Sequence, residues 1–433
     1  MLKNFQLKNG LQVATFDLPS LRSVHLRIIA KGGSLVEKAS KNGVAHFMEH
    51  MLVQGTPSLP NAEEFSSFVE SLAGNYGAYT ERLLIAFNIT VPATHLEDAV
   101  RISSEVFFEP LFVEAALEKE RRAVIEELKQ NMDSHYFEIS KFFRHNRFLP
   151  RHPLTLDPGG TVETVSKLKR QDLVDFWQKY FIPQNAYLLV SGRFEENKLR
   201  ALLEQYFLKG NGKIPFPGYP HLSDKDFSQR GVYIRTDPKL GANYIDLTFP
   251  SLSLSDNLPT RLKQNLALVI LGGLRNSRLF KLLRYQKGLV YGVHAGASLL
   301  PNLGYVYITS EVTPVRLEEV VTLTLSELKA YVADGPTEEE LKFVKNYLSN
   351  QWLMAFDHPS AIAGWIENDL MWNDAIRLPE DYIKMVSDMT TSDIKEVMQT
   401  QWDFAKLSLT VQGPIEDTPE VKNHYERILE VLP

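Results

Sequence analysis

Residues 43–56 read GVAHFMEHMLVQGT, and this stretch constrains the fold and chemistry of the chain more than any other. At about 100° per residue in a helix, His46 and His50 project roughly 40° apart, and Glu49 projects roughly 60° to the other side. Five apolar residues follow the i, i+3, i+4, i+7, i+8 stripe: Val44, Phe47, Met48, Met51 and Leu52. The pattern therefore predicts an amphipathic helix with one apolar face and one face of imidazole and carboxylate groups.

Two imidazoles one helical turn apart can bind a single metal ion, and a carboxylate between them is placed to polarise a water molecule at that ion. His46, Glu49 and His50 form the pattern His-x-x-Glu-His, which is the inverted zincin motif. The alternative is three ordinary residues on a helix surface, because such a pattern arises by chance in about 1% of chains this long. The motif favours zinc chemistry without proving it.

A catalytic zinc ion needs a third protein ligand, and the chain has no cysteine, so this ligand must be histidine or a carboxylate. The other histidines lack a partner at helical spacing, and we expect them to be structural or exposed: His25, His95, His135, His145, His152, His221, His294, His358 and His424. Residues 114–133, EAALEKERRAVIEELKQNMD, predict a helix with Glu120 and Glu127 on one stripe. Glu118 and Glu126 form a competing stripe, and a solvated charged face is the alternative. Spacing alone does not choose among these carboxylates.

Composition narrows the class of protein. A chain of 433 residues with 44% hydrophobic residues and 23% charged residues is an ordinary globular protein of two or three domains. A net charge of −6 gives no basic surplus for nucleic acid or an anionic membrane. The longest nearly apolar run, Leu266 to Leu274, is too short to span a bilayer.

The chain begins MLKNFQLKNG, whose Lys3, Asn4 and Lys8 do not fit a signal peptide. The absence of cysteine fits the cytoplasm and is also compatible with the periplasm. We therefore expect a cytoplasmic protein; a periplasmic or organellar location stays open if a leader has been removed.

Residues 208–224, LKGNGKIPFPGYPHLSD, interrupt all periodicity with glycine and proline. Ten positions between Ser166 and Gly192 recur in the same order and without a gap 221 residues later, between Ser387 and Gly413. These features predict a duplication: an N-terminal domain at 1–210, a linker at 211–224 and a homologous C-terminal domain at 225–433.

Alternation predicts strands at 11–16, 24–30, 84–91, 186–191, 232–235, 244–249 and 406–412. Helical periodicity predicts helices at 62–71, 96–107, 114–133, 277–285 and 337–354, and residues 289–293 are predicted to form a further strand. Short and long connections mix along the chain. We therefore expect an α+β fold of two homologous domains, each a largely antiparallel sheet packed with helices.

The stretch GVAHFMEHMLVQGT closely resembles the zinc-binding helix of the insulinase/pitrilysin family, which includes the mitochondrial processing peptidases. In that family the third ligand is a Glu before an aliphatic residue, about 77 positions after the second His, in an E-x6-E pattern. Glu127 lies 77 positions after His50, Leu128 follows it, and Glu120 precedes it by seven. The resemblance implies that His46, His50 and Glu127 bind Zn²⁺ and that Glu120 orients the site.

Two further segments carry the resemblance: HPLTLDPGGTVETVSKLKRQDL from His152, and LGGLRNSRLFKLLRYQKGLVYGV from Leu271. The second resembles a family signature with an Arg and a Tyr seven apart, here Arg284 and Tyr291, which in the family bind substrate or the oxyanion. One departure concerns an Asn-Ala pair that helps to hold the substrate backbone. Here Gly77 stands at the Asn position, which removes a side-chain donor, and Asn75 lies close by.

The resemblance implies a zinc endopeptidase that cleaves unstructured peptides, with Glu49 as general base and with Glu120, Arg284 and Tyr291 in supporting roles. No organic cofactor is implied. The alternative is a non-catalytic or partner-dependent structural subunit of a two-chain peptidase, although such subunits typically lose the His-x-x-Glu-His helix or the Arg/Tyr pair. We expect peptide substrates and a homodimer, or a heterodimer with a paralogue, and neither nucleic acid nor a membrane as a partner.

Overall fold

The computed structural model describes residues 2–210, 216–373 and 375–432. Two compact units are found, and neither is continuous in sequence. Unit 1 comprises Met1–Ser134, Leu156–Pro220 and Met354–Ile376, and unit 2 comprises His135–Thr155, His221–Leu353 and Arg377–Pro433. Each unit thus includes a segment from the other half of the chain. The expected linker at 211–224 stays a prediction, because residues 211–215 lie outside the described residues.

A six-stranded sheet forms the centre of unit 1, in the order β1-β2-β6-β3-β5-β4. Its strands are β1 (Leu2–Gln6), β2 (Gln12–Asp17), β3 (Ser23–Lys31), β4 (Asn75–Thr80), β5 (Leu84–Pro92) and β6 (Ala186–Gly192). All neighbours pair antiparallel except β2 and β6, which are parallel. Strand β4 is therefore an edge of the sheet.

Both faces of this sheet are covered. One face packs with helices of the first half of the chain into a large apolar core that includes Leu26, Ile28 and Phe87. These helices are α1 (Val44–Met51), α2 (Ala62–Ser71), α3 (Leu96–Phe108), α4 (Glu114–Met132), α6 (Val162–Lys167), α7 (Arg170–Tyr180) and α8 (Glu196–Phe207). Alternate strand residues such as Ile29 and Ala86 point to the opposite face, because successive side chains of a strand alternate.

The opposite face of this sheet is covered by α13 (Pro359–Trp372), which comes from the second half of the sequence. Ile362, Ala363 and Ile366 of α13 are fully or almost fully buried there. Glu367 of the same helix accepts a hydrogen bond from the Arg27 guanidinium on β3 at 2.8 Å, within an ion pair that is largely withdrawn from solvent. Apolar burial and one largely buried ion pair thus attach α13 to the sheet of unit 1.

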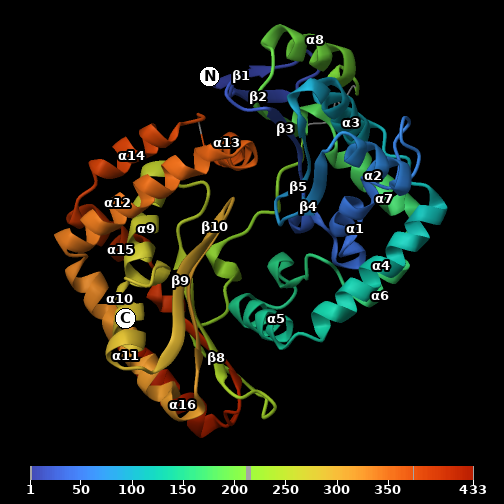
Figure 1. Ribbon diagram of the computed structural model, residues 1–433. Helices are drawn as coiled ribbons and strands as arrows, with labels where there is room; N and C mark the ends of the chain where they lie inside the picture. Colours follow the sequence, from blue (N-terminus) through green and yellow to red (C-terminus); the bar gives the residue numbers. More distant parts are fainter. Residues whose placement is uncertain (1, 211–215, 374, 433) are drawn as a thin grey trace. The chain divides into compact units, whose positions relative to one another are not determined.

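Unit 2 repeats this topology, without a counterpart of β1, in a five-stranded sheet with the order β7-β11-β8-β10-β9. Its strands β8, β10 and β9 are labelled in Figure 1. The strands are β7 (Gly231–Thr236), β8 (Asn243–Ser251), β9 (Val290–Leu300), β10 (Leu303–Val312) and β11 (Ser408–Gly413). As β6 does in unit 1, β11 pairs parallel with one neighbour and antiparallel with the other. Strands β2, β6, β3, β5 and β4 therefore correspond to β7, β11, β8, β10 and β9.

The helices of unit 2 are α5 (His135–Arg147), α9 (Leu258–Leu268), α10 (Arg278–Phe280), α11 (Leu317–Asp334), α12 (Glu338–Met354), α14 (Pro379–Ser387), α15 (Thr391–Gln401) and α16 (Pro419–Leu429). Helix α15 begins and ends 221 residues after α7, as the sequence repeat predicts. Helix α5 comes from the first half of the chain, and its Arg147 pairs with the buried Asp246 of β8 at 2.6 Å. The predicted α+β fold with two mostly antiparallel sheets is confirmed.

Helix α2 is formed over the predicted residues, and most of the predicted strands are found within one or two residues of their expected ends. The exception is β9, which runs seven residues beyond the predicted 289–293. Strands β1, β4 and β10 were not predicted. Of the helices in the described ranges, none combines the length and hydrophobicity that spanning a bilayer requires.

Candidate metal centre

Helix α1 begins without a side-chain cap from its own N-terminus, because Gly43 stands there with a φ of 94°. The carboxylate of Glu37 provides the missing acceptors. It accepts hydrogen bonds from the backbone nitrogens of Gly43 at 2.9 Å and Ala45 at 2.7 Å, and from the Asn42 amide at 2.8 Å. Burial raises the pKa of Glu37 to about 7, and these three hydrogen bonds act in the opposite direction. The first turn of α1 is thereby fixed.

The predicted apolar stripe of α1 is confirmed by burial. Phe47, Met48 and Met51 expose at most 1% of their surface. His46, Glu49 and His50 are half-buried on the remaining sector. Because the apolar face fills the core of unit 1, the helix has no freedom to rotate, and the polar sector always faces the same way.

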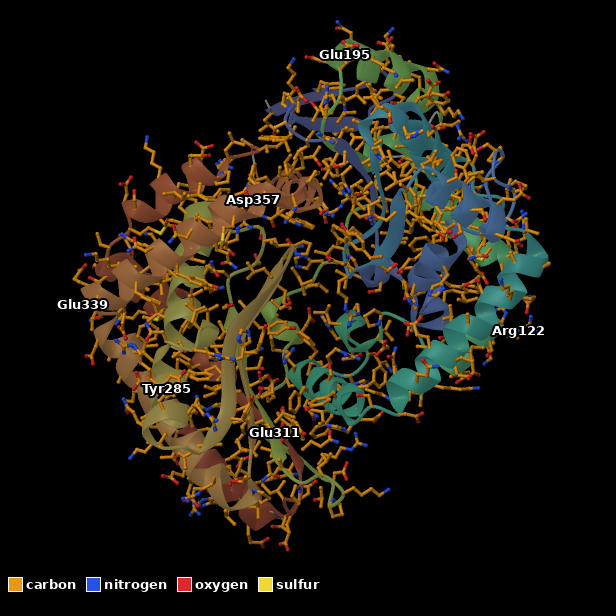
Figure 2. The ribbon with its side chains drawn as sticks, in the orientation of Figure 1. Arg122, Glu195, Tyr285, Glu311, Glu339 and Asp357 are labelled. Carbon is orange, nitrogen blue, oxygen red and sulfur yellow. The ribbon has the colours of Figure 1, made fainter. Side chains whose placement is uncertain are left out.

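Helix α4 supplies the carboxylates. It packs through Leu117, Val124 and Leu128, and Arg122 points to solvent on its outer side (Figure 2). The competing stripe has its own partners at the surface: Glu118 pairs with Arg121 at 2.9 Å and Glu126 with Lys129 at 2.6 Å. The stripe with Glu120 and Glu127 is the one that reaches α1.

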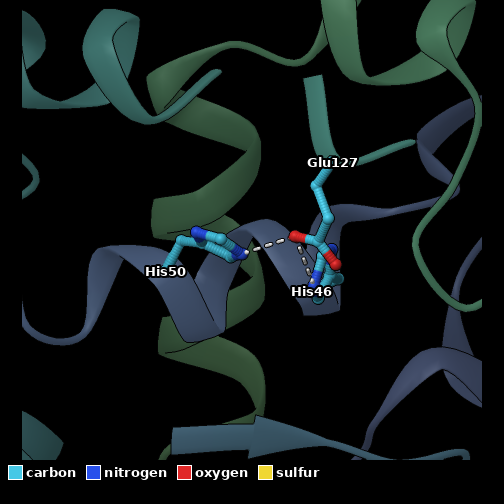
Figure 3. A group of neighbouring side chains, drawn as sticks. All are labelled: His46, His50 and Glu127. Carbon is cyan, nitrogen blue, oxygen red and sulfur yellow. Dashed lines mark ion pairs between the residues drawn. The ribbon is translucent and has the colours of Figure 1, made fainter. Parts of the chain in front are cut away.

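His46, His50 and Glu127 form one cluster (Figure 3). The Oε2 atom of Glu127 lies 3.8 Å from Nε2 of His46 and 3.5 Å from Nε2 of His50. Two ligand atoms of a tetrahedral zinc ion lie roughly 3.3 Å apart, given zinc–ligand distances of about 2.0–2.1 Å. Two imidazole nitrogens and one carboxylate oxygen at this spacing fit a zinc ion with one position left open.

The surroundings of His46 favour its neutral imidazole, which is the form that binds metal. Burial lowers the pKa of His46, the charge of His50 lowers it further, and Glu127 and Asp157 oppose these effects. His50 has a second contact: its Nδ1 lies 3.3 Å from Oε2 of Glu120. This contact leaves Nε2 of His50 as the nitrogen that faces Glu127.

Glu49 is outside the cluster of His46, His50 and Glu127, although it belongs to the same helix sector as the two histidines. Burial raises its pKa, while a hydrogen bond to the Thr80 side chain and the charge of His50 lower it. The Thr80 hydroxyl also lies 3.2 Å from the carbonyl oxygen of Ala45. Thr80 ends the edge strand β4, so this strand and the carboxylate of Glu49 are neighbours.

Arg284 and Tyr291 form a pair within unit 2. The predicted helix at 277–285 is a short α-helix, Arg278–Phe280, that continues as a π-helical segment, Lys281–Gln286. The Arg284 guanidinium donates to the carbonyl oxygen of Val290 at 3.2 Å and lies 5.0 Å from the centre of the Tyr291 ring. Tyr291 is 84% exposed. The Arg284 guanidinium and the Tyr291 phenol are thus adjacent and both exposed to solvent.

At the position of the family's Asn-Ala pair, Gly77 and Ala78 lie in β4. The Asn88 side chain on β5, opposite Gly77 in register, donates to the carbonyl oxygen of Gly77 at 2.8 Å. Asn75 begins the strand and is exposed. A side-chain amide therefore does stand beside Gly77, but it comes from the neighbouring strand.

Residues 12–156 match the model of the insulinase family (peptidase family M16), and residues 167–348 match the model described as the peptidase M16 inactive domain. The chain belongs to the M16 insulinase family. His46, His50 and Glu127 fall in the first matched region, whereas Arg284 and Tyr291 fall in the second.

Individual relatives agree with this membership. An uncharacterized zinc protease of Streptomyces coelicolor is 25% identical over 422 residues, which cover 96% of this M16 chain and 91% of the relative. A protease from Helicobacter pylori shares the fold with a TM-score of 0.84 and 21% identity, covering 96% and 99% of the two chains. A chain of complex III2 from Candida albicans, with Inz-5 bound, has a TM-score of 0.80 and 16% identity, covering 99% and 100%.

Sequence reasoning missed three residues at this M16 site: Glu37, Thr80 and Asp157. None belongs to a periodic pattern with the His-x-x-Glu-His helix, and each reaches the site through the tertiary fold. The one local signal is the left-handed Gly43 at the start of α1, which leaves the helix in need of a distant cap.

Proposed function

We propose that this M16 chain is a zinc endopeptidase that hydrolyses unstructured peptides. The observation that carries the proposal is the cluster of His46, His50 and Glu127, with Glu49 on the same helix sector but outside the ligand set. A third ligand from a separate helix distinguishes a built metal site from two histidines that merely share a helix face. The names of the curated relatives as zinc proteases support the same conclusion.

In this proposal Glu49 and Glu120 have different roles in the reaction. When bound, a zinc ion supplies a Lewis acid that polarises the scissile carbonyl and acidifies a water molecule. Glu49 takes the proton from the attacking water and returns it to the leaving amine. Its half-buried position raises the pKa of this carboxyl, which suits a group that must both accept and release a proton. Glu120 holds His50 in its metal-binding orientation.

The edge strand supports an extended substrate. Within the described residues, β4 pairs with β5 only, so its other edge keeps backbone groups available for a further strand. Thr80 of β4 contacts Glu49, which places this edge beside the proposed general base. An unfolded peptide can add to such an edge through main-chain hydrogen bonds, whereas the backbone of a folded protein is already paired.

Arg284 and Tyr291 are proposed to bind a substrate carbonyl or the developing oxyanion. Their exposure supports a role in binding, because within the described part of the chain the Arg284 guanidinium uses one donor, on the Val290 carbonyl oxygen, and a guanidinium has five N–H donors. We further propose a closed homodimer, since this chain carries the metal motif and the Arg/Tyr pair together. A structural-subunit role is the alternative, and the complex III2 chain of the same fold is a member of a larger assembly.

The proposal is tested with a library of quenched fluorescent peptides, using the wild-type chain, its Glu49→Gln variant and a chelator-treated sample. We expect cleavage by the wild type alone. Zinc binding without cleavage in the wild type would favour the structural subunit. Light scattering tests the dimer: a mass near twice 49.3 kDa is expected, a monomer contradicts it, and activity that needs a different added chain favours a heterodimer.

A further inference from the structure

The two imidazoles of the cluster differ in their outer contacts. A histidine that binds zinc through one ring nitrogen normally donates the other N–H to a carboxylate, a carbonyl or water, and this contact fixes the tautomer. His50 has Glu120 for this purpose, at 3.3 Å from its Nδ1. Nδ1 of His46 is buried and makes no hydrogen bond with any residue that the structure describes. A metal-bound His46 would carry a proton on this atom and would need an acceptor.

The segment 157–160, Asp-Pro-Gly-Gly, lies against the start of α1 and is firmly held there. The Asn42 amide donates to the carbonyl oxygen of Asp157 at 2.7 Å, and the backbone nitrogen of Gly160 donates to the same oxygen at 3.0 Å. The Arg82 guanidinium donates to the carbonyl oxygen of Leu156 at 2.9 Å. The backbone that carries the Asp157 side chain is therefore fixed relative to α1.

Two glycines allow the close approach. A Cβ on Gly160 would lie 2.6 Å from the carbonyl oxygen of Asn42, and a Cβ on Gly43 would lie 2.7 Å from that of Gly159. Both distances are too short for real side chains. Gly160 also has a φ of 81°, in the left-handed region that favours glycine. Residues 157–160 can therefore lie next to α1 only because positions 43 and 160 are glycine.

Gly159 leaves an opening between Asp157 and His46. A Cβ at Gly159 would lie 3.7 Å from Oδ1 of Asp157 and also 3.7 Å from Nδ1 of His46. Its third neighbour is Cδ2 of Leu128, at 3.0 Å, the residue directly after Glu127. The position of this Cβ is therefore equally distant from the carboxylate oxygen and the buried nitrogen, and the Leu128 side chain bounds it on a third side.

We propose that Asp157 is the positioning residue for His46, and that it accepts the Nδ1–H of His46 through one water molecule in the space beside Gly159. A water molecule needs polar partners to occupy a buried site, and this space has a donor on one side and an acceptor on the other. Oδ1 of Asp157 is held in place by the backbone nitrogen of Gly159, which donates to it at 3.1 Å.

This arrangement would give each metal-binding imidazole its own carboxylate: Glu120 for His50 and Asp157 for His46. The two carboxylates come from different parts of unit 1, one from α4 and one from the loop that precedes α6. The inference rests on the proposed function only for the identity of the metal. It concerns metal affinity and geometry, and cleavage is not needed to test it.

The test compares Asp157→Asn, Asp157→Ala and the control Asp175→Asn, an exposed residue of α7 in the same unit. Zinc affinity is measured by competition with a chromophoric chelator, and the geometry by the visible absorption of the Co²⁺-substituted protein. We expect Asp157→Ala to lose about 10–100-fold in zinc affinity with an altered Co²⁺ spectrum. Asp157→Asn should lose less, because it keeps the oxygen that accepts from Gly159. The control should match the wild type.

A second variant tests the route through water. Gly159→Ala fills the space without removing the charge, and Gly241→Ala, at a position with open space around it, is its control. Weaker zinc binding in Gly159→Ala alone supports the bridge, and wild-type affinity in Gly159→Ala contradicts it.

Zinc affinity and a Co²⁺ spectrum within twofold of the wild type in both Asp157 variants would overturn the inference. If the wild type binds zinc, the variants weaken it, and no peptide is cleaved, then the proposed peptidase function fails while the role of Asp157 stands. A wild-type chain without affinity for zinc would overturn both.

Discussion

Nδ1 of His50 lies 3.3 Å from Oε2 of Glu120, which belongs to helix α4. Glu127, seven residues later on the same helix, faces Nε2 of the same ring. One stripe of α4 therefore supplies both an acceptor for the outer nitrogen and an oxygen beside the inner nitrogen. Two turns of helix separate the two carboxylates, which lets them contact opposite edges of a single imidazole ring.

This relationship predicts an order of metal retention. Glu127→Gln should weaken zinc binding most, because it removes the charged ligand atom, and Glu120→Gln should lose about 10–100-fold in affinity. Glu126→Gln is the matched control, since Glu126 pairs with Lys129 at the surface. Zinc content after dialysis measures the order. Equal zinc content in the Glu127 and Glu126 variants would refute it.

Glu49→Gln should keep its zinc and lose turnover. The amide is nearly isosteric with the carboxyl and stands outside the ligand cluster, so the metal site is undisturbed. Loss of a general base should reduce kcat by roughly 10²–10⁴. Elemental analysis and steady-state kinetics on a fluorescent peptide check both halves. Near-wild-type turnover would remove Glu49 from the mechanism.

Glu37 should make stability depend on pH. Burial raises its pKa from 4.5 to about 7 in the folded chain. The folded chain therefore binds the carboxyl proton more tightly than the unfolded chain does. The stabilisation is complete below the unfolded pKa and is lost as the pH rises through about 7. Chemical denaturation from pH 4.5 to 8 should therefore show a fall in the free energy of unfolding that is smaller in Glu37→Gln. An identical pH profile for the two chains would contradict the raised pKa.

Glu367→Gln should destabilise unit 1. The change removes the carboxylate that pairs with the Arg27 guanidinium, and the two side chains of this pair are each only 13% exposed. Breaking a fully buried ion pair from one side costs about 3–5 kcal/mol, and this partly exposed pair should lose less. The denaturation midpoint of Arg27→Met/Glu367→Leu should lie above that of Glu367→Gln, because no unpaired charge remains buried. A double variant less stable than the single one would show that the pair itself is the stabilising feature.

Much of the site follows from local pattern. The polar sector and the apolar stripe of α1 follow from helical periodicity, and the buried residues agree with it. Periodicity also predicts α4. It does not decide whether the stripe of Glu118 and Glu126 or the stripe of Glu120 and Glu127 supplies the metal ligand. Only packing through Val124 and Leu128 decides which stripe meets α1. The choice of Glu127 therefore needed either a family pattern or the structure.

The contributions from distant residues could not be predicted from spacing. Glu37 caps α1 from outside the helix, and Asp157 approaches it through a loop of glycines. The attachment of α13 to the sheet of unit 1 has the same character, because its apolar residues indicate burial without indicating against which sheet. Strand β4 was missed because its residues NYGAYT alternate too weakly, and it exists as a strand because β5 pairs with it.

The central claim is that His46, His50 and Glu127 hold one zinc ion per chain. The most direct measurement is the zinc content of the purified, dialysed wild-type protein by elemental analysis, beside His46→Ala and His50→Ala variants of confirmed fold. The account predicts one zinc ion per wild-type chain and little or none in either variant. A wild-type chain without zinc that also fails to bind added zinc, or variants that retain a full equivalent, would contradict it.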